Sequence, residues 1–150
     1  MAITASGLYV VTFTDILDTT QLAVDLDLET HKTAMFTNSI TPNFSTDTAY
    51  GVAPYNANEV SGAGYTAGGE LLTGTALSES PTGSIKYDAN DVSWAASTIT
   101  NARGALVYAD ALAGNNALMF FNFGADFSTV GGTFTIQWAS GGLFGLDLTP

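Results

Sequence analysis

The chain has 150 residues, the length of one ordinary domain, and a globular chain of that length buries about 70% of its unfolded surface. Its 3 Lys and Arg residues against 14 Asp and Glu residues give a net charge of −11. Because that charge repels phosphate backbones and anionic lipids, we expect neither a nucleic-acid partner nor a membrane partner. Cysteine is absent, which excludes disulfides, thiolate metal sites and cysteine nucleophiles.

The first predicted element is an apolar stretch near the N-terminus. Residues 8–13 predict an extended arm, which forms either an edge strand of the chain's own sheet or an addition to a neighbour's sheet, and we favour the former. The chain is therefore divided into an N-terminal arm, residues 1–13, and a single domain, residues 14–150. Residues 15–22, behind Thr14 as a candidate N-cap, predict at most one short helix.

Three acidic residues and the sole histidine follow. Asp25, Asp27 and Glu29 alternate, so on a strand their carboxylates would share one face. They form either a structural cation site or a solvated acidic edge; the spacing does not match a calcium-binding loop, which favours the edge. His31 lacks a recognisable catalytic partner in the sequence and is interpreted as a surface histidine without a catalytic role.

The rest of the chain predicts short strands separated by turns. Residues 105–109 and 117–123 predict a hairpin, and residues 133–138 and 144–148 predict a second one at the end of the chain. No alternating helices are present to cover a parallel sheet, so we expect an all-β fold, an antiparallel β-sandwich of Ig-like or jelly-roll-like type. The remaining predicted strands are residues 33–37, 70–77, 84–88 and 97–100.

A long segment, residues 38–69, is rich in small and polar residues and contains three tyrosines. Tyrosines in such a loop suit contacts with a partner, although packing against the sandwich accounts for them equally well. The same choice applies to the apolar arm. The candidate partner-binding residues are Leu8, Tyr9, Val10, Val11 and Phe13 in the arm and Tyr50, Tyr55 and Tyr65 in the loop.

Motifs that would indicate catalysis are missing. The nucleophile-elbow pattern G-x-S-x-G and the two glycine-rich phosphate-binding patterns do not occur. Fourteen acidic residues offer pairs for glycoside hydrolysis, but nothing beyond their number marks such a pair. We therefore expect no enzymatic activity, no cofactor, no metal site and no small-molecule substrate.

Residues 58–69 (Asn-Glu-Val-Ser-Gly-Ala-Gly-Tyr-Thr-Ala-Gly-Gly), with the strands at 133–138 and 144–148, resemble a family of small structural proteins of tailed bacteriophages. The resemblance extends over nearly the whole chain. It implies a virion component, first of all a capsid decoration (cement) protein that binds the major capsid protein and also itself, as a homo-oligomer such as a trimer. The acidic surface agrees with a place on the outer face of the capsid, because packaged DNA would repel it. The alternative is a phage tail or fibre component that binds a host receptor.

Overall fold

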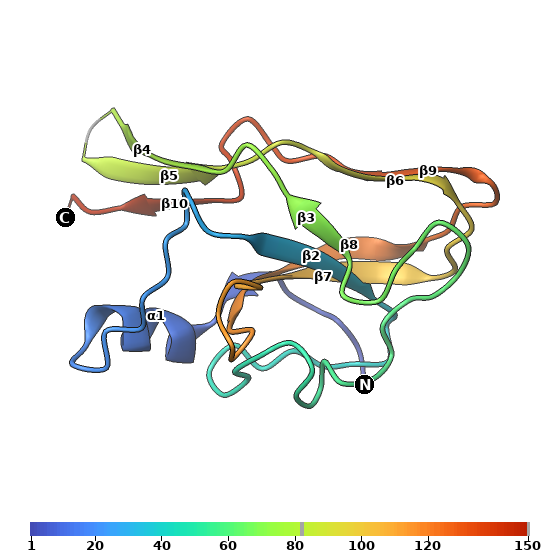
Figure 1. Ribbon diagram of the computed structural model, residues 1–150, viewed down its shortest axis with the longest axis horizontal. Coiled ribbons are helices and arrows are strands. Elements are labelled where there is room, and N and C mark those ends of the chain that lie inside the picture. The colour runs from blue at the N-terminus through green and yellow to red at the C-terminus, as the bar shows by residue number, and fades with distance from the viewer. Residues whose placement is uncertain (82, 150) are drawn as a thin grey trace.

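The structure is a computed structural model that describes residues 1–81 and 83–149 (Figure 1). Its one α-helix in these residues is α1, Val10–Leu17. No helix in the described part of the chain has the length and apolar character needed to cross a membrane. The strands are β1 (Gly7–Leu8), β2 (His31–Phe36), β3 (Glu70–Leu72), β4 (Ala76–Ser80), β5 (Ser84–Asp88), β6 (Val92–Ser97), β7 (Ala102–Tyr108), β8 (Ala117–Phe127), β9 (Gly132–Ile136) and β10 (Phe144–Asp147).

The strands form three antiparallel sheets that pack into a sandwich. A five-stranded sheet of order β1-β8-β7-β2-β3 lies in the middle of the molecule (Figure 1). Two small sheets, β10-β5-β4 and β6-β9, lie end to end over one face of it. This arrangement confirms the all-β sandwich predicted from the sequence.

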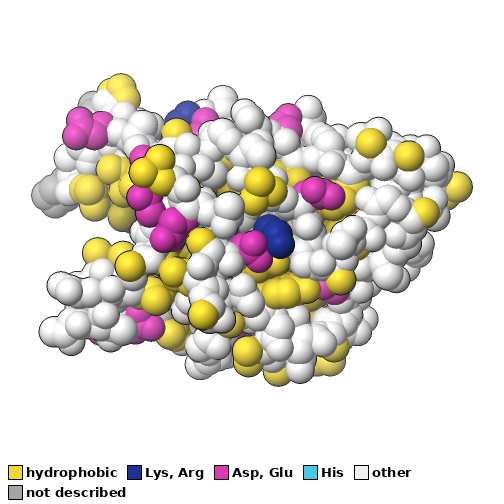
Figure 2. Space-filling model, in the orientation of Figure 1, with side chains coloured by type: hydrophobic (Ala, Val, Ile, Leu, Met, Phe, Trp, Pro, Cys, Tyr) yellow, Lys and Arg dark blue, Asp and Glu magenta, His cyan; other side chains and the backbone are white. Residues whose placement is uncertain are grey.

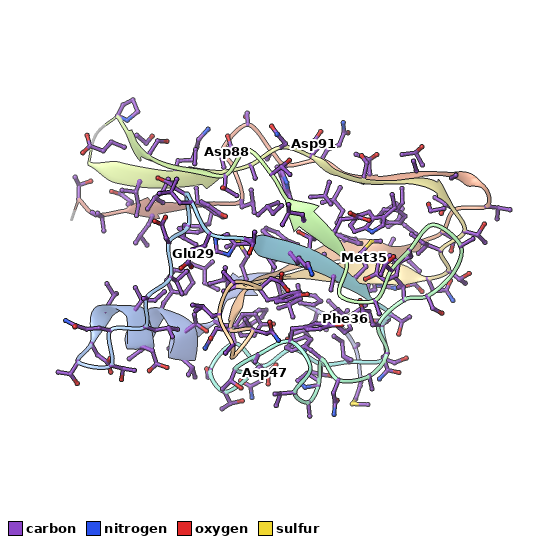
Figure 3. All side chains as sticks on the ribbon, viewed as in Figure 1. Glu29, Met35, Phe36, Asp47, Asp88 and Asp91 are labelled. Carbon is purple, nitrogen blue, oxygen red and sulfur yellow. The ribbon has the colours of Figure 1, made fainter. Side chains whose placement is uncertain are left out.

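The other face of the five-stranded sheet is covered by irregular chain, chiefly the long segment at residues 37–69 (Figure 1). The central strands are therefore buried on both sides, and neighbouring residues belong to different cores. In β2, Met35 packs into the core between the sheets, whereas Phe36 packs into the core under the long segment (Figure 3). Successive side chains of a strand point to opposite faces, which explains this division.

The helix begins earlier than predicted. Residues 15–22 were expected to be helical, but α1 spans Val10–Leu17, and Thr14 is not its N-cap. The predicted extended arm at residues 8–13 is correspondingly wrong beyond Leu8. Two anchors fix the observed start: Tyr9 is buried, and the hydroxyl of Thr12 donates a hydrogen bond to the Ala117 carbonyl oxygen, 2.6 Å away. Tertiary packing thus overrides the preference of Val-Val-Thr-Phe for a strand.

The predicted hairpin of β7 and β8 is confirmed, but the C-terminal hairpin is wrong. β9 pairs with β6, and β10 pairs with β5 in the other small sheet. Trp94 in β6 lies opposite Phe134 in β9, with ring centroids 6.1 Å apart, so the aromatic side chains favour this pairing. The Leu143 N–H then donates to the Tyr87 carbonyl oxygen at 2.8 Å, which starts β10 along β5.

Two further strand boundaries differ from the prediction. The strand expected at residues 70–77 is two strands, β3 and β4, separated by a turn in which Gly74 has a φ of +62°. The strand expected at residues 97–100 is misplaced, because β6 spans Val92–Ser97 and ends where the predicted strand begins. Ile99 instead exchanges backbone hydrogen bonds with Thr129.

Candidate functional site

An apolar cleft lies between helix α1 and the small sheet β10-β5-β4. In Figure 2 it is the hollow at the left end of the molecule, where hydrophobic side chains gather. It has a volume of about 510 Å³, and the segment at residues 23–29 closes it. Its apolar lining consists mainly of Phe13, Ile16 and Leu17 from α1 and Leu77, Ile85, Phe144 and Leu146 from the sheet.

Local periodicity places these side chains on facing surfaces. Phe13, Ile16 and Leu17 are three and four residues apart, so they share one face of α1. In the sheet, Ile85 lies directly opposite Leu146, so both point to the same side. The cleft is thus formed where the apolar face of a short helix meets the inner face of a small sheet.

The mouth of the cleft exposes large apolar side chains. Leu17 is 84% exposed, Leu146 is 45% exposed and Leu77 is 38% exposed. Each exposed Å² of apolar surface costs about 25 cal/mol relative to its burial, so a partner that covers these residues gains free energy. Clustered exposed leucines at a concave surface are typical of a protein-docking site.

The acidic segment behind the cleft forms a turn and not a strand, so the alternation of its carboxylates does not place them on one face of a sheet. The Asp25 carboxylate accepts the N–H groups of Asp27 and Leu28, at 2.9 and 3.1 Å, and Glu29 accepts that of Asp25 at 3.0 Å. The Asp27 carboxylate accepts the N–H of Leu77, which ties the turn to β4. These carboxylates therefore cap backbone groups, and no group of three or more metal-ligating side chains forms in the described residues.

His31 is fully buried behind this turn. Its Nε2 lies 3.0 Å from the carbonyl oxygen of Asp25, and its Nδ1 has no hydrogen-bond partner among the described residues. Burial lowers the pKa of His31 below the ordinary 6.5, although the nearby Glu29 and Asp25 act in the opposite direction. The surface position expected for this histidine is therefore wrong, because β2 buries it behind the turn.

Two of the predicted partner-binding tyrosines are core residues. Tyr9 is 0% exposed and Tyr55 is 2% exposed. Their hydroxyls share a hydrogen bond, and the Tyr55 hydroxyl also donates to the Asp47 carboxylate at 3.2 Å. Burial raises the pKa of both hydroxyls. Neither side chain is accessible to a partner, so the partner-binding role expected for them is wrong. They instead join the N-terminal segment to the long loop.

Tyr50 and Tyr65 are held by Glu59, which the sequence did not single out. Glu59 accepts hydrogen bonds from Tyr50 at 2.9 Å, from Tyr65 at 2.7 Å and from the Gly68 N–H at 2.7 Å. Burial and the bond to Glu59 raise the pKa of Tyr50 to about 12. The motif at residues 58–69 thus folds around one carboxylate. The available signal was that Glu59 is the sole acidic residue between Asp47 and Glu70.

The predicted residues of the arm are distributed over several places. Val10 is exposed on α1, whereas Leu8 and Val11 are half-buried. Phe13 is the one predicted residue that lines the cleft. The other apolar residues of the cleft were missed because they come from separate segments and no local pattern unites them.

A second apolar surface lies between the edges of β8 and β9. This slot has a volume of about 420 Å³, and Phe123, Phe127, Phe134 and Ile136 line it. The slot lies against β9 of the small sheet β6-β9, and the cleft lies against the small sheet β10-β5-β4. These two sheets occupy opposite ends of the long axis (Figure 1). The chain therefore carries apolar surfaces toward both ends.

Comparison of the chain with protein-family models, with curated proteins and with solved structures gave no match. A concave apolar surface with exposed leucines suits the docking of another protein.

Proposed function

We propose that this chain is a bacteriophage virion structural protein, a capsid decoration (cement) protein on the outer surface of the head. In this role it binds the major capsid protein and stabilises the contacts between neighbouring capsid subunits. The sequence resemblance of residues 58–69 and of the two C-terminal strands suggests the family, and the surface of the folded chain suggests how it acts.

The observation that carries the proposal is the pair of apolar surfaces, the cleft and the slot, near opposite ends of the long axis. A protein that bridges two neighbours needs two separate contact surfaces. Contacts that are individually weak become strong when one molecule or oligomer holds several capsid subunits at once.

The distribution of charge supports the outer face of the shell. The three basic side chains are all engaged in ion pairs: Lys32 with Asp110, Lys86 with Asp88 and Arg103 with Asp126. The remaining acidic side chains give the surface its net charge of −11. Such a surface is repelled from DNA packed inside a head.

The test is co-sedimentation of the purified protein with expanded, undecorated phage heads. We expect saturable binding at a fixed ratio to the major capsid protein, together with heads that resist heating better than bare heads. Mass photometry of the free protein gives its oligomeric mass and so relates that ratio to sites on the capsid lattice. Absence of binding to heads, with binding to host cells, would overturn the proposal in favour of a tail or fibre component.

Variants make the test specific to the cleft. Leu17→Gln combined with Leu146→Thr removes two exposed apolar side chains and keeps the net charge. Val52→Thr combined with Leu71→Thr is the matched control, because both residues are about half exposed and neither lines the cleft or the slot. We expect the cleft variant to lose occupancy on heads and the control to keep it.

A further inference from the structure

The charged residues that line the cleft are all acidic. They are Asp25, Asp27 and Glu29, and no Lys or Arg belongs to the lining. One more acidic residue, Asp18, caps the C-terminal end of α1 next to Leu17. None of these four takes part in the three ion pairs of the described residues.

The small sheet adds another carboxylate to the mouth of the cleft. Glu79 lies two residues after Leu77 in β4, so both side chains point to the same side of the strand. Lys86 is the basic residue of this sheet, but it lies on the opposite face from Ile85 and is paired with Asp88 at 2.8 Å. The cleft is therefore apolar inside and negatively charged around its rim.

We propose that the cleft binds a segment of a partner protein in which bulky apolar side chains are flanked by lysine or arginine. This inference rests on the proposed function and deepens it, because it names the chemistry of the partner at the same cleft. The apolar side chains enter the cleft between α1 and the sheet, and the basic side chains meet the carboxylates at its rim.

Electrostatic repulsion disfavours a second copy of the chain in the cleft and favours a basic segment. A copy would bring its own acidic surface, and its few basic side chains are already engaged in ion pairs. Surface charges interact over a screening length of about 10 Å at 0.1 M salt, so the carboxylates that line the cleft attract a basic side chain bound at its rim. Complementary charge speeds association and discriminates between partners.

The edge of β4 indicates that the segment is recognised through its side chains. The N–H of Leu77 already donates to the Asp27 carboxylate, and the Thr75 hydroxyl donates to the Asp27 carbonyl oxygen at 2.8 Å. The turn at Asp27 thus occupies the outer edge of β4 where an added strand would pair. Binding at this end therefore depends on apolar anchors and charge, and not on extending the sheet through β4.

The experiment uses three labelled synthetic peptides as probes and the full chain as receptor. The first peptide alternates leucines with lysines, the second has glutamates in place of the lysines, and the third has serines in place of the leucines. Binding is measured by fluorescence anisotropy at low and at high salt. We expect the leucine-lysine peptide to bind at least about tenfold more tightly than either of the others, and less tightly as salt increases.

Variants of the protein assign the binding to the cleft. Leu17→Gln combined with Leu146→Thr should weaken it about tenfold, whereas Val52→Thr combined with Leu71→Thr should leave it within about twofold. Asp18→Asn combined with Glu79→Gln should weaken it and reduce its dependence on salt. Its matched control is Glu70→Gln combined with Asp91→Asn, which removes the same charge from the start of β3 and from the residue before β6, away from α1 and β4.

Equal binding of the lysine and glutamate peptides would overturn the inference, as would equal effects of the cleft variants and their controls. The outcome is separable from that of the proposed function. Peptide binding at the cleft without binding to heads would sustain this inference and overturn the decoration role. If the protein binds heads, the cleft variants leave that binding unchanged and no peptide binds, the decoration role would be sustained and this inference overturned.

Discussion

The ring of Phe13 in α1 meets the ring of Phe144 in β10 edge-on, with ring centroids 5.9 Å apart and planes at 88°. Phe144 in turn lies 5.6 Å from the ring of Tyr87 in β5. Edge-on aromatic pairs of this kind contribute about 0.5–1.5 kcal/mol beyond the burial of their surface. The contact joins the helix to the small sheet and sets the separation of the two walls of the cleft.

Removal of the Phe13 ring should therefore affect both stability and binding. Phe13→Ala is expected to lower the free energy of unfolding by about 1–2 kcal/mol, less than for a fully buried ring because Phe13 is half-buried. It should also weaken binding of the leucine-lysine peptide. Urea denaturation and fluorescence anisotropy measure the two effects.

The control for this prediction is Phe127→Ala. Phe127 is also partly exposed and contacts another ring, that of Phe123 at 6.3 Å, but it lies in the slot. This control is expected to lose stability and to keep its affinity for the peptide. An equal loss of affinity in both variants would contradict the role given to Phe13.

Glu59 should be among the most sensitive polar positions of the chain. Glu59→Gln keeps the shape of the side chain but replaces one acceptor oxygen of the carboxylate with an NH₂ group, which cannot accept the bonds donated there. We expect the free energy of unfolding to fall by about 2–4 kcal/mol, since bonds to a charged acceptor are stronger than neutral ones. Urea denaturation tests this, with the exposed Glu70→Gln as control. Similar stabilities of the two variants would refute the prediction.

High pH should unfold the protein through its tyrosines. All six tyrosines have a pKa raised above the ordinary 10, chiefly by burial, and that of Tyr50 is about 12. Because the folded-state pKa exceeds the unfolded one, the stability that the neutral hydroxyls contribute is complete below pH 10 and is lost as pH rises above it. Phenolate absorbance and circular dichroism followed against pH should therefore change together. Phenolate formation that precedes the loss of circular dichroism would contradict this.

Mild acid should act through His31. Its pKa is lowered in the folded chain, so between that lowered pKa and 6.5 the unfolded chain binds a proton that the folded chain does not. Stability from this residue is therefore present above pH 6.5 and decreases below it, with a slope of at most about 1.4 kcal/mol per pH unit. The free energies of unfolding of wild type and of His31→Gln, measured by urea denaturation, should diverge below that pH. Contributions from the acidic residues are common to both proteins and cancel in the difference.

A second measurement keeps this prediction open to refutation if the variant does not fold. The imidazole NMR signals of the wild-type protein should not titrate near pH 6.5. A normal titration midpoint, or parallel stability curves for the two proteins, would show that burial does not affect the protonation of His31.

Local sequence patterns predicted the fold where neighbouring segments pair. The hairpin of β7 and β8 follows from two apolar runs on either side of the turn at residues 113–116. The same logic failed at the end of the chain, because the choice of partner for β9 and β10 depends on Trp94 and Tyr87, some 40 to 60 residues earlier. The helix at Val10 was missed for a similar reason, since distant contacts of Tyr9 and Thr12 determine it.

The candidate site was less predictable than the fold. Its lining comes from α1, the turn at residues 25–29, the strands β4 and β5, and β10, and each of these contributes only one to a few of the residues. Leu17 and Leu146 belong to one surface only because contacts between segments far apart in the sequence bring them to the same end of the molecule. Of the four predicted partner-binding tyrosines, Tyr9 and Tyr55 belong to the core, and Tyr50 and Tyr65 are half-buried and bonded to Glu59.

The placement of the three basic residues also determines how proteases act on the chain. Trypsin cleaves after Lys32, Lys86 and Arg103, and these residues lie in the paired strands β2, β5 and β7. The irregular segment at residues 37–69 contains no such cleavage point. Digestion by trypsin therefore reports the separation of strands and not the motion of loops. Complete digestion at the three sites gives the fragments 1–32, 33–86, 87–103 and 104–150, so residues 87–103 are the short peptide by which this chain is detected in a tryptic digest of a purified particle.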